Sequence, residues 1–191
     1  MLFRSLAACE ETPVTERDFA LVFSGRGWHK GVAGIVASRI VERFYRPAIV
    51  LCEEDGIAAG SGRSIPGFDL LAALEAMPDI FLRYGGHRQA AGLSLEAARV
   101  PEFRERLNAY AAARLTAADL QPEIRVDATI ELGEISGEAV AEVLAMAPFG
   151  CGNPAPVFCI RGAEVCAPPT LMKEKHLRVS LRQGGRVLML K

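Results

Sequence analysis

The stretch RYGGHRQAAGLSL at residues 83–95 places two glycines directly before one of the chain's three histidines. Residues without a Cβ let the backbone approach a phosphate closely, and the His87 imidazole can donate a hydrogen bond to the same oxygens. In this interpretation the amides of Gly85 and Gly86 form an anion-binding nest. The alternative is a tight Gly-Gly turn beside a half-buried His87. The spacing alone favours this alternative, because such turns are common.

Two further segments have residue types that suit an anion. At Ser61-Gly62-Arg63-Ser64 the fork-shaped Arg63 guanidinium and the Ser61 hydroxyl suit a phosphate, although an exposed strand end has the same composition. Trp28 and His29 precede a predicted helix whose first N–H groups are free to hold an anion. The alternative there is that Trp28, the only tryptophan, anchors the core. Neither segment decides between its alternatives.

The C-terminal part of the chain is basic. Residues 161–191 contain seven Lys or Arg against two Glu, a net of five positive charges. Such a surface can follow a phosphate backbone, but the segment has no aromatic residue on which bases would stack. A solvated barrel surface has the same composition. The cations predicted to bind nucleic acid are Arg161, Lys173, Lys175, Arg178 and Arg182.

Other chemistries are not indicated. The histidines lie far apart in the sequence and no HExxH or DHH segment occurs, so we predict neither a metal site nor a catalytic residue in this chain. Five cysteines without a CxxC pair favour a reducing, cytoplasmic setting. The net charge of −1 argues against a uniformly basic polyanion binder, and no apolar run is long enough for a membrane span.

The elements expected before residue 116 alternate between α and β. Strands are predicted at 19–25 and on both sides of a turn at 53–56, because each is a short apolar run closed by turn residues. Helices are predicted at 31–45, 69–77 and 100–115 from apolar residues at three- and four-residue steps. A first domain of mixed α/β type is therefore expected over residues 14–115.

A second, mostly-β domain is expected over residues 122–191. Strands are predicted at 123–132, 157–165, 176–183 and 186–190, with one helix at 135–150. This arrangement suggests a small OB-fold-like barrel. An OB-fold needs about five strands and four are counted, so either one strand is irregular or the chain stops inside the domain.

Four ordered segments carry a resemblance to a known family. They are WHKGVAGIVASRIVERFYRPAIVL, GSGRSIPGFDLLAAL, RYGGHRQAAGLSL and APFGCGNPAPVF. Together they resemble the C-terminal half of the RecJ family of single-strand-specific 5′→3′ exonucleases in the DHH superfamily. The resemblance implies a DHHA1 domain followed by an OB-fold, with Mn²⁺ or Mg²⁺ held in a separate DHH domain that we expect to be absent from this chain.

The resemblance also implies roles for the candidate residues. Arg63, Ser61, Gly85, Gly86 and His87 would hold substrate phosphates opposite the metal ions, and the OB-fold would guide a single DNA strand. This reverses the preference for a structural His87, whose additional role as a general acid stays open. Single-strand binding protein is an implied partner. The chain alone is expected to bind without cutting.

Two other functions are compatible with the sequence. One is a non-catalytic single-strand-binding or adaptor module that acts through the basic C-terminal segment. The other is a different DHH-superfamily phosphodiesterase that acts on small nucleotides, although the strand-rich segment after APFGCGNPAPVF argues against it.

Overall fold

The chain divides into two compact units, Met1–Pro122 and Glu123–Lys191, here called unit 1 and unit 2. The computed structural model describes residues 7, 9, 11, 13–173 and 176–191. Unit 1 alternates helices and strands, and unit 2 is mostly β-structure, as predicted. No helix within the described ranges is long and apolar enough to cross a membrane.

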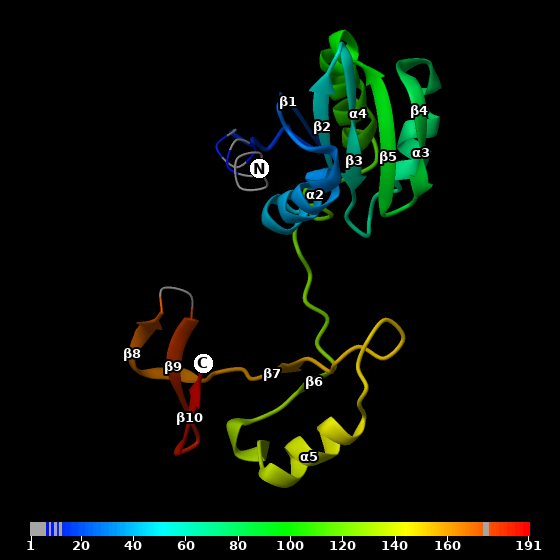
Figure 1. Cartoon of the computed structure of the whole chain (residues 1–191). Helices are drawn as coiled ribbons and strands as arrows, with labels where there is room; N and C mark the ends of the chain where they lie inside the picture. Colours follow the sequence, from blue (N-terminus) through cyan, green and yellow to red (C-terminus); the bar gives the residue numbers. More distant parts are fainter. Residues whose placement is uncertain (1–6, 8, 10, 12, 174–175) are drawn as a thin grey trace. The chain divides into compact units, whose positions relative to one another are not determined.

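Unit 1 is built on one five-stranded sheet with the order β1-β2-β3-β5-β4 (Figure 1). β1 runs parallel to β2, and the other neighbours are antiparallel. The parallel pair needs a crossover, which α2 provides. The strands are β1 (Leu21–Arg26), β2 (Ala48–Glu54), β3 (Ile57–Arg63), β4 (Phe81–His87) and β5 (Ala90–Glu96).

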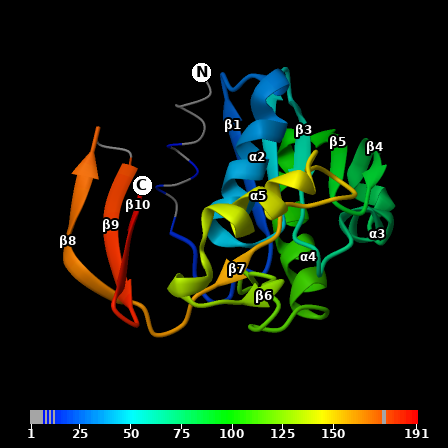
Figure 2. The same cartoon turned by 90° about the horizontal axis from the view of Figure 1, so that it is seen from below.

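Helices cover both faces of this sheet (Figure 1 and Figure 2). α2 (Lys30–Phe44) packs on one side with Ala48 and Val50 of β2, while α3 (Leu70–Glu75) and α4 (Val100–Ala112) pack on the other with Ile49 and Leu51. The buried residues therefore form two hydrophobic clusters, one on each side of the sheet. Because alternate residues of a strand point to opposite sides, the strand pairing assigns every paired residue to one of these two faces. We call these the α2 face and the α4 face.

The helices begin and end at residues that suit their termini. The side chain of His29 caps α2 by accepting a hydrogen bond from the Gly31 amide at 3.1 Å, and Asp69 caps α3 in the same way through the Ala72 amide. α2 ends at Tyr45, which has a left-handed conformation. The helices predicted at 31–45, 69–77 and 100–115 are confirmed, with ends that differ by at most three residues.

An ion-pair network holds the start of β4 against α4. Arg106 donates two hydrogen bonds to the Asp79 carboxylate, at 2.8 and 2.9 Å, and Arg99 bonds to the Asp79 backbone carbonyl. Glu102 accepts from both arginines. Asp79 lies in the short helix η1 (Pro78–Ile80), and Arg99 ends η2 (Ala97–Arg99). The hydrogen bonds from Arg106, followed by weaker contributions that include Arg99, lower the pKa of Asp79 to about 2.

Replacing Asp79 with asparagine is expected to destabilise the protein at neutral pH and to matter less as the pH falls. The folded-state pKa of about 2 lies below the ordinary value of 3.8, so the carboxylate stabilises the fold above that ordinary value. This stabilisation is lost as the pH falls through the folded-state pKa. Urea midpoints of both proteins should therefore converge between pH 7 and pH 2. The control is Glu75→Gln, at an exposed position outside the network. Its urea midpoint should differ from that of the unchanged protein by the same small amount at every pH.

Unit 2 contains two small sheets and one helix. β10-β9-β8 form an antiparallel sheet, and β6 pairs in parallel with β7. The elements are β6 (Ala128–Thr129), η3 (Leu132–Glu134), α5 (Gly137–Ala145), β7 (Phe158–Cys159), β8 (Glu164–Met172), β9 (His176–Gln183) and β10 (Arg186–Leu190).

Two strand predictions in unit 2 are wrong in extent. The strand predicted at 123–132 contains only the two residues of β6, because only β7 pairs with that segment. The strand predicted at 157–165 is interrupted between β7 and β8. The last two strands are confirmed as β9 and β10.

Unit 2 buries little apolar surface. Among its described residues Leu132 is the one fully buried hydrophobic side chain. Polar contacts join its parts instead: Gln183 accepts from the Leu132 amide and donates to the Arg161 carbonyl, while Arg186 donates to the Gly133 and Ile135 carbonyls. The stability of this unit therefore depends on hydrogen bonds more than that of unit 1 does.

Candidate functional site

The sheet register brings Arg63 and His87 onto the same face. Arg63 lies opposite Ala90 of β5, and Ala90 lies opposite His87 of β4. On its other side Arg63 lies opposite Ala48, which packs under α2. All of these side chains therefore project from the α2 face, and the Cα atoms of Arg63 and His87 are two strand spacings apart, about 10 Å.

The next row on the same face consists of small residues. Ser61 lies opposite Gly92, and Gly92 lies opposite Gly85. α2 packs mainly over β2 and β3, so Gly85, Gly92 and His87 stay exposed. A Cβ added to Gly85 would meet nothing within 4 Å. The backbone of β4 and β5 is therefore accessible from the α2 face next to both candidate side chains.

The alternative interpretation of Gly85-Gly86 as a tight turn is wrong, because both glycines lie inside β4 and the turn falls at Arg88 and Gln89. The predicted nest of two amides also does not form, since successive amides of a strand point to opposite edges. Gly86 is required for a different reason. Its φ is +152° and an added Cβ would lie 2.4 Å from the Ala90 carbonyl oxygen.

Arg63 is held in place without a charged partner. Its Nη1 donates to the Ser61 hydroxyl at 2.7 Å and to the Gly62 carbonyl at 2.8 Å. The Ser61 hydroxyl in turn donates to the Ala91 carbonyl at 3.2 Å. Within the described ranges no carboxylate forms an ion pair with Arg63. A half-buried, oriented cation without a counter-ion is suited to an external anion.

Arg83 is a further candidate that the sequence did not indicate. The pairing of β4 with β5 shifts register between Phe81 and Arg83, and Arg83 lies opposite Ser94 of β5. It therefore shares the α2 face with Gly85 and His87. Its side chain is exposed and has no hydrogen-bond or ion-pair partner in the described part of the chain. The alternation Arg83-x-Gly85-x-His87 would have indicated it if the segment had been interpreted as a strand.

The segment around His29 has a structural role. Trp28 packs against the buried hydrophobic residues between α2 and the sheet, and its indole lies where a side chain on Gly25 would be. His29 caps α2, so its imidazole already uses one of the free amides of the helix terminus. A polar pocket of about 330 Å³ next to these residues includes Cys52, whose pKa burial raises. The Cys52 thiol is therefore not an activated nucleophile.

The basic residues predicted in unit 2 are only partly gathered. Arg178 and Arg182 project from the same side of β9 and both are exposed. Lys173 directly follows the last residue of β8, and Arg161 precedes the first residue of β8. Lys175 lies outside the described residues.

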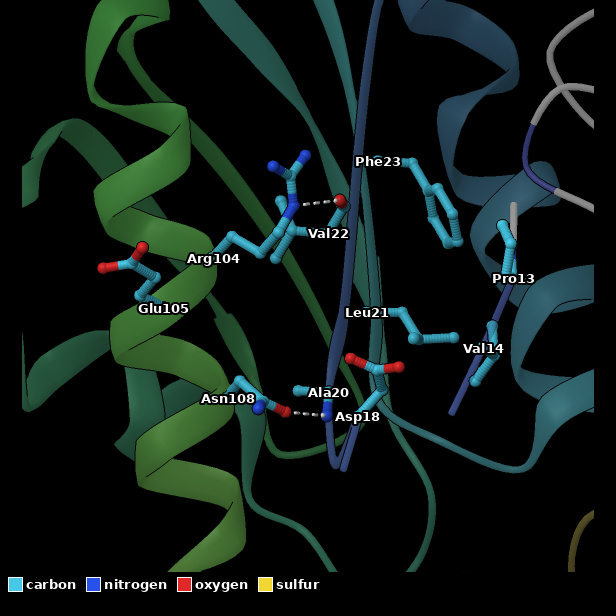
Figure 3. Close-up of a pocket in the computed structure, with 10 residues that line it drawn as sticks. All are labelled: Pro13, Val14, Asp18, Ala20, Leu21, Val22, Phe23, Arg104, Glu105 and Asn108. Carbon is cyan, nitrogen blue, oxygen red and sulfur yellow. Dashed lines mark hydrogen bonds between the residues drawn. The ribbon is translucent and has the colours of Figure 1, made fainter. Parts of the chain in front are cut away.

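A pocket of about 270 Å³ lies along β1, at the opposite edge of the sheet from β4, and is lined by α4 on one side and by Pro13 and Val14 on the other (Figure 3). Arg104 donates to the Val22 carbonyl there, and Asn108 accepts from the amides of Phe19 and Ala20. These side chains bind one carbonyl at the outer edge of β1 and two amides just before the strand begins. The polar side chains in this pocket therefore serve to attach α4 to the edge strand.

The described residues contain no group of three or more His, Cys, Asp or Glu side chains that could hold a metal ion.

Comparison with known proteins assigns both units. The model of the DHHA1 domain matches residues 17–113, and the model of the RecJ OB domain matches residues 126–190. The chain belongs to the DHHA1 domain family. This confirms the fold class expected from the sequence, a mixed α/β domain followed by a β-rich OB domain.

Within that family the chain is similar to RecJ, as the four sequence segments indicated. It is 47% identical over 172 residues to the single-stranded-DNA-specific exonuclease RecJ of Bacillus subtilis (strain 168), which is 88% of this chain and 22% of the relative. It is 36% identical over 172 residues to RecJ of Thermus thermophilus, which is 88% of this chain and 24% of the relative. The chain thus spans about a quarter of the length of these relatives and corresponds to their C-terminal part.

Two solved structures agree with this assignment. The crystal structure of RecJ in complex with Mn²⁺ from Thermus thermophilus matches with a TM-score of 0.77 and 29% identity, over 100% of this chain and 27% of that one. The Mg²⁺ complex from the same source matches with a TM-score of 0.77 and 32% identity, over 99% of this chain and 28% of that one. Divalent metal ions are therefore found in the structures of its relatives.

Proposed function

We propose that this chain is the substrate-binding part of a RecJ-like exonuclease that removes nucleotides from the 5′ end of single-stranded DNA. The observation that carries the proposal is the row of half-buried Arg63 and exposed His87 on the α2 face, with the small residue Ala90 of β5 between them. Metal-dependent hydrolysis of the phosphodiester bond would come from a DHH domain, which holds the Mn²⁺ or Mg²⁺.

The residues on the α2 face divide the binding task between them. Arg63 donates to a phosphate oxygen through the guanidinium nitrogens that Ser61 and Gly62 do not use. Ser61 holds Arg63 in its orientation. His87 donates a second hydrogen bond to the phosphate. Gly85 has no side chain, so the phosphate can reach the backbone of β4. Arg83, further along β4, contacts the phosphate backbone of the single-stranded DNA.

The OB domain contributes weaker and less specific binding of the DNA. Arg178 and Arg182 project from one side of β9 and would attract the backbone of the strand electrostatically, together with Arg161, Lys173 and Lys175. Single-strand binding protein as a partner stays a prediction.

Binding to a short 5′-phosphorylated single-stranded oligodeoxynucleotide tests the proposal. Arg63→Gln is expected to lower the affinity about tenfold or more, because a hydrogen bond to a charged group is worth about 1.5–3 kcal/mol. The dependence of affinity on salt should also become less steep, because one cationic contact is lost. His87→Ala should act in the same direction with a smaller salt effect. Fluorescence anisotropy at several salt concentrations measures both quantities.

The matched control is Arg39→Gln, which removes an exposed cation from α2 that pairs with Glu42 at 2.8 Å. It should leave affinity nearly unchanged. A second control, the double variant Arg178→Gln/Arg182→Gln, separates the two units: if charge in the OB domain dominates, it will weaken binding more than Arg63→Gln. Equal affinity of the folded Arg63→Gln and unchanged proteins would refute the proposed site. Release of nucleotides by the chain alone with Mn²⁺ would refute the division of labour.

A further inference from the structure

Gly34 lies in the interior of α2, where glycine is an unfavourable residue. In a helix interior it costs about 0.5–1 kcal/mol relative to alanine, because more backbone freedom is lost on folding. Its φ does not lie in the left-handed region, so the backbone of the helix does not require it. The reason for a glycine at this position must therefore lie in what faces it.

The atoms that face Gly34 belong to Arg63 and Ser61. A Cβ added to Gly34 would lie 2.8 Å from Nη2 of Arg63, 3.4 Å from its Cζ and 3.5 Å from the Ser61 hydroxyl oxygen. A carbon atom cannot approach a guanidinium nitrogen to 2.8 Å without a shift of one of them. The guanidinium therefore occupies the space that a side chain on Gly34 would fill.

The guanidinium is fixed on one side only. Nη1 is bound by the Ser61 hydroxyl and the Gly62 carbonyl, whereas Nη2, the nitrogen nearest to Gly34, has no acceptor within the described residues. The end of an arginine side chain is flexible, so a Cβ on Gly34 would displace the guanidinium rather than the helix. That displacement would strain both hydrogen bonds of Nη1 and move Nη2.

We propose that Gly34 is a positioning residue: its missing side chain lets the Arg63 guanidinium lie against α2 in the orientation, fixed by Ser61 and Gly62, in which it binds the substrate phosphate. This inference rests on the proposed function of Arg63. It explains why a residue that weakens the helix stands at this point, and it links α2 to a site whose side chains all come from strands.

The test is Gly34→Ala in the full chain, with a 5′-phosphorylated single-stranded oligodeoxynucleotide as the probe. Affinity is expected to fall about tenfold, comparable to the loss of a charge-assisted hydrogen bond. The melting temperature should stay the same or rise, because alanine favours the helix. A merely structural glycine would show the opposite result, a lower melting temperature and an unchanged affinity.

Two further variants make the test specific. Gly137→Ala changes another helical glycine, at the start of α5, where an added Cβ meets nothing within 4 Å, and it should leave affinity unchanged. Arg63→Lys replaces the branched guanidinium with a shorter chain that has no Nη2. In the Arg63→Lys background, Gly34→Ala should have no further effect on affinity.

The outcomes separate this inference from the proposed function. If Arg63→Gln weakens binding and Gly34→Ala does not, the inference is wrong and the proposed function stands. If neither weakens binding, the proposed function is wrong as well. If Gly34→Ala weakens binding equally in the Arg63→Lys background, the glycine acts through another contact and the inference is overturned.

Discussion

Gly60→Ala is expected to destabilise unit 1 by about 3 kcal/mol, the upper part of the usual range for overpacking. A Cβ at this position would lie 1.9 Å from the Val50 carbonyl oxygen and 3.0 Å from the Leu51 Cα. Both atoms belong to the backbone of β2, which is paired on both sides and cannot yield. The variant must therefore separate two central strands, one of which carries Arg63.

Urea unfolding measures this loss as a lower midpoint at an unchanged slope. The matched control is Gly92→Ala in the neighbouring strand, where the nearest atom to an added Cβ is the Gly60 carbonyl oxygen at 3.9 Å. This control should be neutral or slightly stabilising, because alanine loses less backbone entropy than glycine. A Gly60→Ala protein with the same midpoint as the Gly92→Ala protein would show that β2 and β3 do not approach as closely as described.

Phe103→Ala is expected to cost about 4 kcal/mol, a large part of the stability of a domain of this size. The Phe103 ring is fully buried on α4 and meets Phe81 edge to face, with 5.2 Å between the centroids. Phe81 is the first residue of β4. Loss of the ring therefore leaves a cavity under the strand that carries His87, and affinity for the oligodeoxynucleotide should fall together with stability.

The control for this variant is Phe103→Leu, which keeps most of the apolar volume and should cost about 1 kcal/mol. Hydrogen exchange distinguishes a local effect from a global one: in the alanine variant the amides of β4 should exchange faster than those of β2. Protection that falls equally in both strands would indicate that Phe103 stabilises the whole sheet and not β4 in particular.

The elements with strong periodic patterns were predictable from the sequence. α2 and α4 repeat apolar residues at helical spacing, and the β2–β3 hairpin has a turn at Asp55-Gly56 between two apolar runs. β4 and β5 were not predicted, because their residues are mostly glycine, alanine and polar side chains with low strand propensity. Pairing with β3 in the folded sheet overrides that propensity, and no local signal reports it.

The candidate site was predictable in its residue types but not in its geometry. Arg63 and His87 were singled out by their glycine neighbours, and the register places them on one face. Arg83 was missed because the strand containing it was missed. The approach of Gly34 to Arg63 joins a helix to a strand about 30 residues away in the sequence, and only tertiary packing produces it.

In unit 2 the sequence predicted strands where alternation was present and missed one where proline was present. β8 contains Pro168 and Pro169, which remove two backbone donors, and its register with β9 shifts around these residues. The strand tolerates them through irregular pairing, so composition alone argues against it.

The irregular pairing at Leu82 determines which residues of β4 meet the solvent. Phe81 lies opposite Leu95 and Arg83 lies opposite Ser94, so Leu82 is the extra residue of a bulge. In a regular strand, without the bulge, Phe81 and Arg83 would share one face because they are two positions apart. A natural homologue that is one residue shorter at Leu82 would keep Gly85 and His87 in phase, whereas one shortened between Arg83 and His87 would turn the imidazole toward α4. Gaps in this family should therefore be tolerated before the strand's arginine and excluded after it.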